Sequence, residues 1–347
     1  MQAAAQPQAP VNTGAHGVSM IEPPLASAKA SFAPDFGQRV LLTVDTEEEF
    51  DWEGPFTRDQ HGLRHVEAIP RFQTFCEDIG AHPVYLVDWP IATDPRAVEI
   101  IGDAVNRGVA DVGVQLHPWV NPPFDEEVCA RNSYAGSLPP ELEAAKFKAL
   151  RDRIEEAFGT PPLIYRAGRY GLGQHSAQIL KDNGIRIDTS VRSLFDYAAQ
   201  YGPDYSNHPL APYWVDEARE LLELPVTSVY WGPLRMLGKH IHRLQRHIPT
   251  FFSGFSRLKL LERIALTPEG VTSAEAMRGI DVALDEGLPL LVLSFHSPTL
   301  APGYTPYAAS TRDVERLYEW LSDVYAYLGK RGVRTANVAD IINATQR

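Results

Sequence analysis

The chain has 347 residues, of which 44% are hydrophobic and 22% are charged; this is typical of a folded globular protein and excludes a disordered one. A formal net charge of -12 at pH 7 argues against a general nucleic-acid binder, because such proteins bind mainly by neutralising phosphates. No apolar run is long enough to span a bilayer, and the N-terminus lacks the basic and apolar regions of a secretory signal. We therefore expect a cytoplasmic protein without a transmembrane segment.

Residues 1–36 are rich in Ala, Pro and Gln, and we predict that they form a disordered tail. Strands and helices then alternate along the chain. Short apolar runs bounded by polar residues indicate buried strands, and longer segments with apolar residues at helical spacing indicate helices. The predicted strands are 40–45, 83–88, 111–117, 162–166, 185–190, 221–226, 288–296 and 333–338, and the predicted helices are 66–79, 95–107, 140–158, 175–183, 273–285, 312–328 and a terminal helix.

This alternation indicates right-handed β-α-β units and a parallel sheet. Roughly seven such units suit a closed or nearly closed barrel better than an open sheet. We therefore predict a single domain over residues 37–347. Residues 232–268 differ from the rest, because between Arg235 and Arg263 Glu262 is the only acid. We interpret this segment as a basic helical insertion, which either is a solvated excursion or faces an anionic substrate or surface.

Polar side chains that suit catalysis end four of the predicted strands. The first strand ends at Asp45 in an acidic stretch, the third at His117, the fourth at Arg166 and the penultimate at His296. Each of them has a structural explanation on its own, such as an ion pair or a helix cap. The carboxyl ends of parallel strands meet at one edge, however, so we expect the four groups to form one site.

The order of these motifs resembles the polysaccharide deacetylases, also called carbohydrate esterase family 4 or NodB-homology enzymes, from about Val40 to Val338. The segment Thr43-Val-Asp-Thr-Glu47 is similar to the Asp-x-Asp form of the first family motif. The segment Leu293-Ser-Phe-His296 matches the motif Leu-x-x-His. The resemblance implies a distorted (β/α)7-type barrel of the NodB-homology kind.

Two motifs depart from the family pattern. The family motif His-x-x-x-His reads His117-Pro-Trp-Val-Asn121 here, and a motif like Arg-x-Pro-Tyr reads Arg166-Ala-Gly-Arg-Tyr170 without the proline. The chain thus resembles a variant branch with His-Pro-Trp. The resemblance implies that Asp45 is the catalytic base, that His296 is the general acid and that Arg166 orients the base.

The resemblance also implies a divalent metal ion, zinc or another transition metal, held by Glu47 and His117. Asn121 stands where the family has its second histidine, and an amide oxygen is a weak zinc ligand. Either Asn121 is the third ligand, or Glu48, Glu49 or a water takes that place.

The implied activity is removal of N-acetyl groups from a bacterial polysaccharide or its precursor, so the expected partner is an N-acetylated polysaccharide or oligosaccharide. Aromatic rings near strand ends either stack on the sugar or pack in the core. The candidates are Trp52, Trp89, Trp119, Tyr170 and Trp231, and of these we predict Trp119, Tyr170 and Trp89 as substrate-binding residues. Two alternatives stay open. One is a non-catalytic polysaccharide-binding barrel, which the change at Asn121 favours, and the other is a different metal-dependent amide hydrolase on the same fold.

Overall fold

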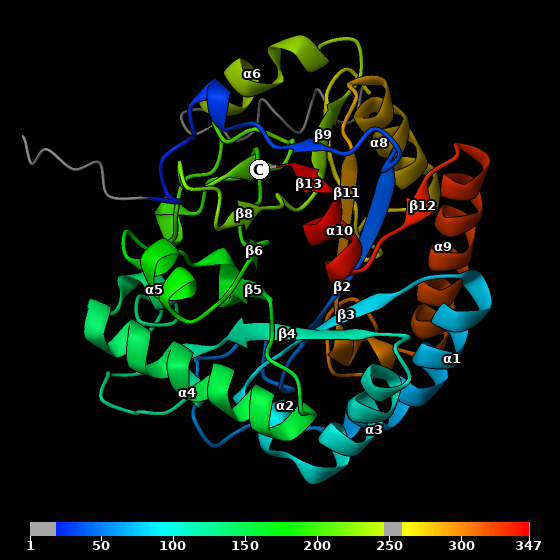
Figure 1. Ribbon diagram of the computed structural model, residues 1–347. Coiled ribbons are helices and arrows are strands. Elements are labelled where there is room, and N and C mark those ends of the chain that lie inside the picture. The colour runs from blue at the N-terminus through cyan, green and yellow to red at the C-terminus, as the bar shows by residue number, and fades with distance from the viewer. Residues whose placement is uncertain (1–18, 246–258, 347) are drawn as a thin grey trace, which may run out of the picture.

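A curled sheet of nine strands forms the centre of the molecule (Figure 1). The computed structural model describes residues 19–245 and 259–346. The strands follow the order β11-β2-β3-β4-β5-β6-β8-β7, with β12 beside the start of β2, and among the described strands of this sheet only β7 runs antiparallel to its neighbour. Their bounds are β2 Arg39–Thr46, β3 Pro83–Val87, β4 Asp111–Leu116, β5 Ile164–Ala167, β6 Ile187–Asp188, β7 Tyr213–Trp214, β8 Leu222–Glu223, β11 Leu290–His296 and β12 Arg334–Thr335.

Helices surround the outer face of this sheet (Figure 1). The apolar faces of these helices pack on the strands. At the start of several helices, a polar side chain accepts a hydrogen bond from a free backbone N–H group. The Asp94 carboxylate accepts a hydrogen bond from the Ala97 N–H at the start of α3, and Thr272 and Glu275 form a capping box at the start of α8. The helices are α1 Ile69–Ile79, α2 Trp89–Thr93, α3 Pro95–Asn106, α4 Pro140–Phe158, α5 Ser176–Asp182, α8 Ser273–Asp285 and α9 Thr311–Lys330.

The two faces of the sheet bury different side chains, because neighbouring residues of a strand point to opposite sides. In β2, Leu42 belongs to the large apolar cluster between sheet and helices, whereas Leu41 belongs to the cluster inside the curl. The helix α10 (Val338–Ala344) adds Ile341 to that inner cluster. Asp45 follows Leu41 at the same two-residue period, so its carboxylate also points inward, at the carboxyl end of the strand.

The described sheet is a curled half-barrel, and a few hydrogen bonds span the gap between β8 and β11 where a closed barrel would have a strand pair. The Thr227 N–H donates to the carbonyl of Val292, and the Ser294 N–H donates to the carbonyl of Leu266, both at 3.2 Å. The antiparallel pair β9 (Ser228–Trp231) and β10 (Glu262–Ala265) lies next to this gap. The predicted mixed α/β architecture is confirmed at this level.

Residues 19–36 are packed on the domain, which corrects the prediction of a disordered tail for that part of 1–36. The strand β1 (Ser31–Phe32) pairs with β13 (Thr345–Gln346) at the other end of the chain. Met20 and Phe36 are buried, at 1% and 4% exposed. Composition misled the prediction because a few apolar side chains suffice to hold this segment. Residues 1–18 lie outside the described residues.

The basic segment predicted as an insertion, residues 232–268, is described in part. It contains α6 (Gly238–Gln245) and β10, and residues 246–258 lie outside the described residues. Across the described ranges, every helix is too short or too polar to cross a membrane.

Candidate active site

The four predicted strand-end groups line one cavity at the carboxyl ends of the strands. The cavity has a volume of about 320 Å³, and its lining includes Asp45, His117, Arg166, His296 and Glu47. The strand register explains why two of these residues lie close together, because Asp45 and His296 are direct partners in the parallel pair of β2 and β11. The expectation of a single site for these groups therefore agrees with the geometry.

Arg166 holds Asp45 by a buried ion pair. The Arg166 Nη1 donates to Asp45 Oδ1 and also to Ser294 Oγ at 2.6 Å. The Nη2 donates to Thr43 Oγ1 at 2.9 Å. Arg166 is only 1% exposed, so each of these polar contacts compensates for the burial of its charge. The pair fixes the direction of the carboxylate, as a positioned base requires.

His296 lies on the other side of Asp45 and is held by a second acid. Its Nε2 is 3.8 Å from Asp45 Oδ2, and its Nδ1 is 2.7 Å from Glu269 Oε2. Burial alone would lower the pKa of His296, but the charges of Glu269, Glu47 and Asp45 outweigh it and raise the pKa to about 10. The imidazole is therefore protonated at neutral pH and can donate a proton.

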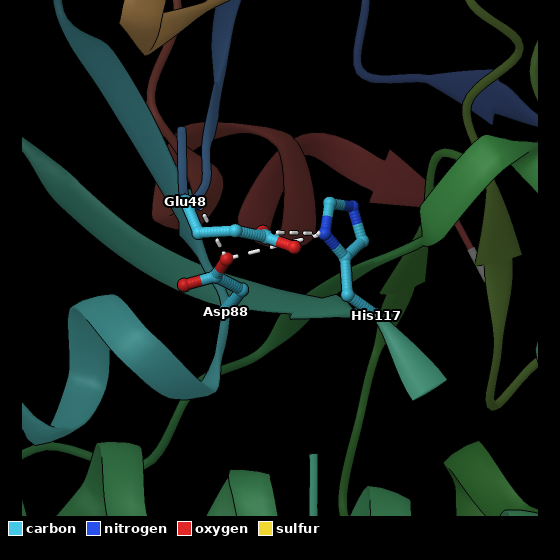
Figure 2. Close-up of side chains that lie close together, drawn as sticks. All are labelled: Glu48, Asp88 and His117. Atoms are coloured by element: carbon cyan, nitrogen blue, oxygen red, sulfur yellow. Dashed lines mark hydrogen bonds and ion pairs between the residues drawn. The ribbon is translucent and has the colours of Figure 1, made fainter. Parts of the chain in front are cut away.

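His117 is held on its Nδ1 side by a group of buried acids (Figure 2). Its Nδ1 lies 2.8 Å from Glu48 Oε2, and Trp119 Nε1 donates to the other oxygen of Glu48 at 2.8 Å. Asp88 Oδ2 accepts the backbone N–H of Glu48 at 2.8 Å. The possible ligand atoms of Glu48, Asp88 and His117 lie within 4.8 Å of one another, so this buried group could bind a metal ion.

The opposite nitrogen of His117 is directed to the cavity side of the site. The Nε2 lies 3.4 Å from Glu47 Oε2, and Glu47 Oε1 is buried without a hydrogen-bond partner. Burial lowers the pKa of His117 to about 4 and raises the pKa of Glu47 well above its usual range. A neutral imidazole is the metal-binding form, and an unpartnered buried carboxylate is stabilised by a cation. These two residues therefore fit a divalent metal ion.

Two predicted site residues are not brought to the cavity. The Asn121 amide nitrogen donates to the carbonyls of Pro122 at 2.7 Å and Lys146 at 2.9 Å, and Asn121 is fully buried away from the cavity lining. A short 3-10 turn over Pro118–Val120 sends the chain in that direction. Trp89 begins α2 and packs partly buried against the outer core. The geometry supports neither the ligand role for Asn121 nor the stacking role for Trp89.

The other two predicted aromatic residues, Trp119 and Tyr170, do line the cavity, and the Trp119 ring stacks on His117 at a centroid distance of 4.4 Å. Trp52, another of the aromatic residues considered for stacking, also lines the cavity, and its ring meets that of His296 edge-on at 4.9 Å. Sequence reasoning missed Asp88 and Glu269 as partners. Asp88 could have been found from the sequence, because it ends a predicted strand as Asp45 does. Glu269 lies in a loop, and no sequence pattern there points to the site.

The structure thus combines a curled, mostly parallel sheet with an arginine-held aspartate, two histidines and buried acids at its carboxyl end. No family model and no curated protein matches the sequence. Among solved structures, a Mycobacterium smegmatis protein provisionally described as a polysaccharide deacetylase has 17% identity and a TM-score of 0.50 over 93% of each chain. The chain therefore has the polysaccharide-deacetylase fold, which confirms the expected resemblance at the level of fold.

Two further similar structures belong by their descriptions to carbohydrate esterase family 4. A pseudoenzyme from Bacillus anthracis has 11% identity and a TM-score of 0.44, over 88% of this chain and 66% of that one. A family 4 acetyl xylan esterase from Clostridium thermocellum, solved with a cobalt ion, has 12% identity and a TM-score of 0.42, over 88% of this chain and 91% of that one.

Proposed function

We propose that the protein is a metal-dependent hydrolase that removes N-acetyl groups from a bacterial polysaccharide or its precursor. The observation that carries this proposal is the arrangement around Asp45. One carboxylate oxygen is bound by Arg166, and the other lies 3.8 Å from the protonated His296. A fixed base beside a fixed acid is what acyl hydrolysis requires.

On the cavity side, Glu47 and His117 Nε2 would hold the metal ion. Glu48 orients His117 by accepting a hydrogen bond from Nδ1, the usual arrangement behind a metal-binding histidine. A divalent ion bound there would polarise the acetamide carbonyl and lower the pKa of a nearby water.

The side chains around the ion then divide the proton transfers. Asp45 takes a proton from the attacking water, and Arg166 keeps its carboxylate aimed at that position. His296 donates a proton to the departing amine, which is a poor leaving group unless it is protonated. Glu269 supports the charged imidazole until it gives up this proton. Trp52 offers a ring surface to the sugar, whereas the Trp119 ring is buried against His117 and supports that side chain.

The test is acetate release from N-acetylglucosamine oligomers by the purified protein, with its metal content measured in parallel. We expect Asp45→Asn and His296→Gln each to lower the rate by roughly 100-fold or more, with the metal content kept. Glu53→Gln, which removes an exposed carboxylate from the same acidic stretch, is the matched control. Full activity in either site variant would contradict the assigned roles.

A second candidate function is carbohydrate binding without catalysis. It is favoured by the position of Asn121, because catalytic zinc sites usually have three protein ligands, and on the cavity side only Glu47 and His117 have been placed among the described residues. This alternative predicts that oligosaccharide binding persists after treatment with a chelator and that no acetate is released at any metal concentration.

A further inference from the structure

Two arginines line the cavity without the acidic partner that Arg166 has. They are Arg169 and Arg192, and within residues 19–245 and 259–346 neither forms an ion pair with a carboxylate. In a protein with a net charge of -12, partly buried guanidinium groups would be expected to find an acid. Their neutral surroundings therefore need an explanation.

Arg169 is placed by an unusual turn directly after β5. Arg169 and Tyr170 both have positive φ angles, of 55° and 60°, a backbone conformation that side chains with a Cβ rarely adopt. Strain of this kind costs of the order of 1 kcal/mol or more per residue and is found mostly at functional sites. The Arg169 guanidinium lies over the Tyr134 ring at 4.2 Å and donates to Ser133 Oγ at 2.5 Å. These contacts are all with neutral groups, so among the described residues no carboxylate pairs with its charge.

Arg192 likewise has no carboxylate partner for its charge among the described residues. Its Nη1 donates to the Tyr197 hydroxyl at 3.3 Å, and its Nε is buried without a hydrogen-bond partner. The guanidinium lies 4.0 Å from the centroid of the Phe195 ring, and Arg263 lies 3.6 Å from the same ring. Burial, and with it the repulsion of Arg192, lowers the pKa of Arg263. Two like charges held against one ring form a locally positive surface.

The two cavity arginines belong to the same side of the cavity. Arg169 Nη2 donates to Gln200 Oε1 at 3.3 Å, and Arg192 donates to Tyr197, so both reach the segment 197–200. Arg263 comes from the basic segment of the chain and adds its charge at the Phe195 ring, outside the cavity lining. The same cavity also holds the acids Asp45 and Glu47, so its lining combines a basic side with the proposed reaction centre.

We infer that the cavity takes a substrate that carries an anionic group, a carboxylate or a phosphate, on or next to the acetylated sugar, and that Arg169 and Arg192 bind this group. Guanidinium groups suit both anions because their planar N–H donors match carboxylate and phosphate oxygens. The inference rests on the proposed function for the acetylated part of the ligand. A neutral chitin-like oligomer would leave both charges unpaired.

The experiment compares three ligands by isothermal titration at low ionic strength: N-acetylglucosamine, N-acetylglucosamine 1-phosphate and 2-acetamido-2-deoxyglucuronic acid. We expect at least one charged ligand to bind roughly tenfold or more tightly than the neutral sugar, with a difference that shrinks as salt is added. The two charged ligands separate phosphate from carboxylate recognition. Arg169→Gln and Arg192→Gln should each remove most of the preference.

Arg312→Gln is the matched control, because it removes the same charge from an exposed position on α9 and should leave the preference unchanged. If a cavity variant fails to fold, Arg192→Lys keeps the charge and should keep part of the preference. Equal affinity of the wild-type protein for all three ligands would overturn the inference, even if acetate is released. A preference for a charged ligand without acetate release would instead support the anion site and count against the proposed hydrolysis.

Discussion

His117 Nδ1 lies 2.8 Å from Glu48 Oε2, on the side of the ring that faces away from the cavity. This contact fixes the ring orientation and leaves Nε2 directed at Glu47. Both oxygens of Glu48 are in use, because Trp119 donates to the second. In the acidic stretch after β2, Glu48 therefore lies away from the cavity and positions His117, whereas Glu47 faces the cavity.

Replacing Glu48 should loosen the metal site without removing a cavity-facing ligand. The substitution Glu48→Gln leaves one acceptor oxygen where the carboxylate serves both His117 and Trp119, so we expect it to weaken zinc binding by about 10–100-fold. Titration with zinc, followed by calorimetry, measures this change, with Glu53→Gln as the control. Unchanged zinc affinity would show that Glu48 does not position the ligand.

The buried pair of Arg166 and Asp45 should matter for stability as well as for activity. Arg166→Met leaves the Asp45 carboxylate buried without its partner, and we expect the free energy of unfolding to fall by about 3–5 kcal/mol. Adding Asp45→Asn removes this unpaired buried charge and should recover part of the lost stability. Urea unfolding of the single and double variants provides the comparison, and a double variant no more stable than Arg166→Met would refute the explanation.

A histidine placed at position 121 should not act as a metal ligand. Asn121 is fully buried, and its amide donates two hydrogen bonds to main-chain carbonyls. We expect Asn121→His to lower the free energy of unfolding by about 1–3 kcal/mol, because these bonds are lost, and to leave zinc affinity unchanged. Tighter zinc binding by this variant would mean that the position can reach the metal site after all.

Glu143 should make the stability of the fold depend on pH. It is 3% exposed on α4, where the Ser176 hydroxyl donates to it, and burial raises its pKa to about 7. The unfolded glutamate releases its proton near pH 4.3, so between about pH 4 and 7 the folded state holds the extra proton and stability falls as the pH rises. At about 1.4 kcal/mol per pH unit over this interval, the loss of stability amounts to roughly 4 kcal/mol by pH 8.

Glu143→Gln removes this dependence, because the amide stays neutral at every pH. We expect the variant to be more stable than wild type at pH 8 and to show a much smaller gain at pH 5, as measured by urea unfolding at both values. Glu141→Gln, at an exposed position of the same helix, is the control. A gain of equal size at pH 5 and pH 8 would contradict the raised pKa.

The buried strands were the most predictable part of the fold. The run that ends at Asp45 is apolar on both faces, and the observed strand, Arg39–Thr46, differs from the prediction by one residue at each end. The predicted strands 185–190 and 221–226 shrink to two residues each, β6 and β8, because irregular chain takes over at the open side of the sheet.

The site was predictable where a residue ends a strand and not where a loop decides its place. Asp45, His117, Arg166 and His296 meet because parallel strands bring their carboxyl ends together. Asn121 follows a turn, and spacing along the chain cannot show that the turn leads its side chain to Lys146. Pairing between distant segments, such as β1 with β13, likewise leaves no local pattern.

That pairing has a practical consequence for handling the protein. Val338 at the start of α10 is hydrogen-bonded to Asp111, the first residue of β4, so the helix that leads to β13 lies at the amino ends of the strands, away from the cavity. Attaching the chain to a surface through residues close to Gln346 would leave the cavity mouth accessible. A shortened version that begins at residue 37 would instead strip β13 of its partner strand, so a useful shortened version keeps the residues from 19 onward.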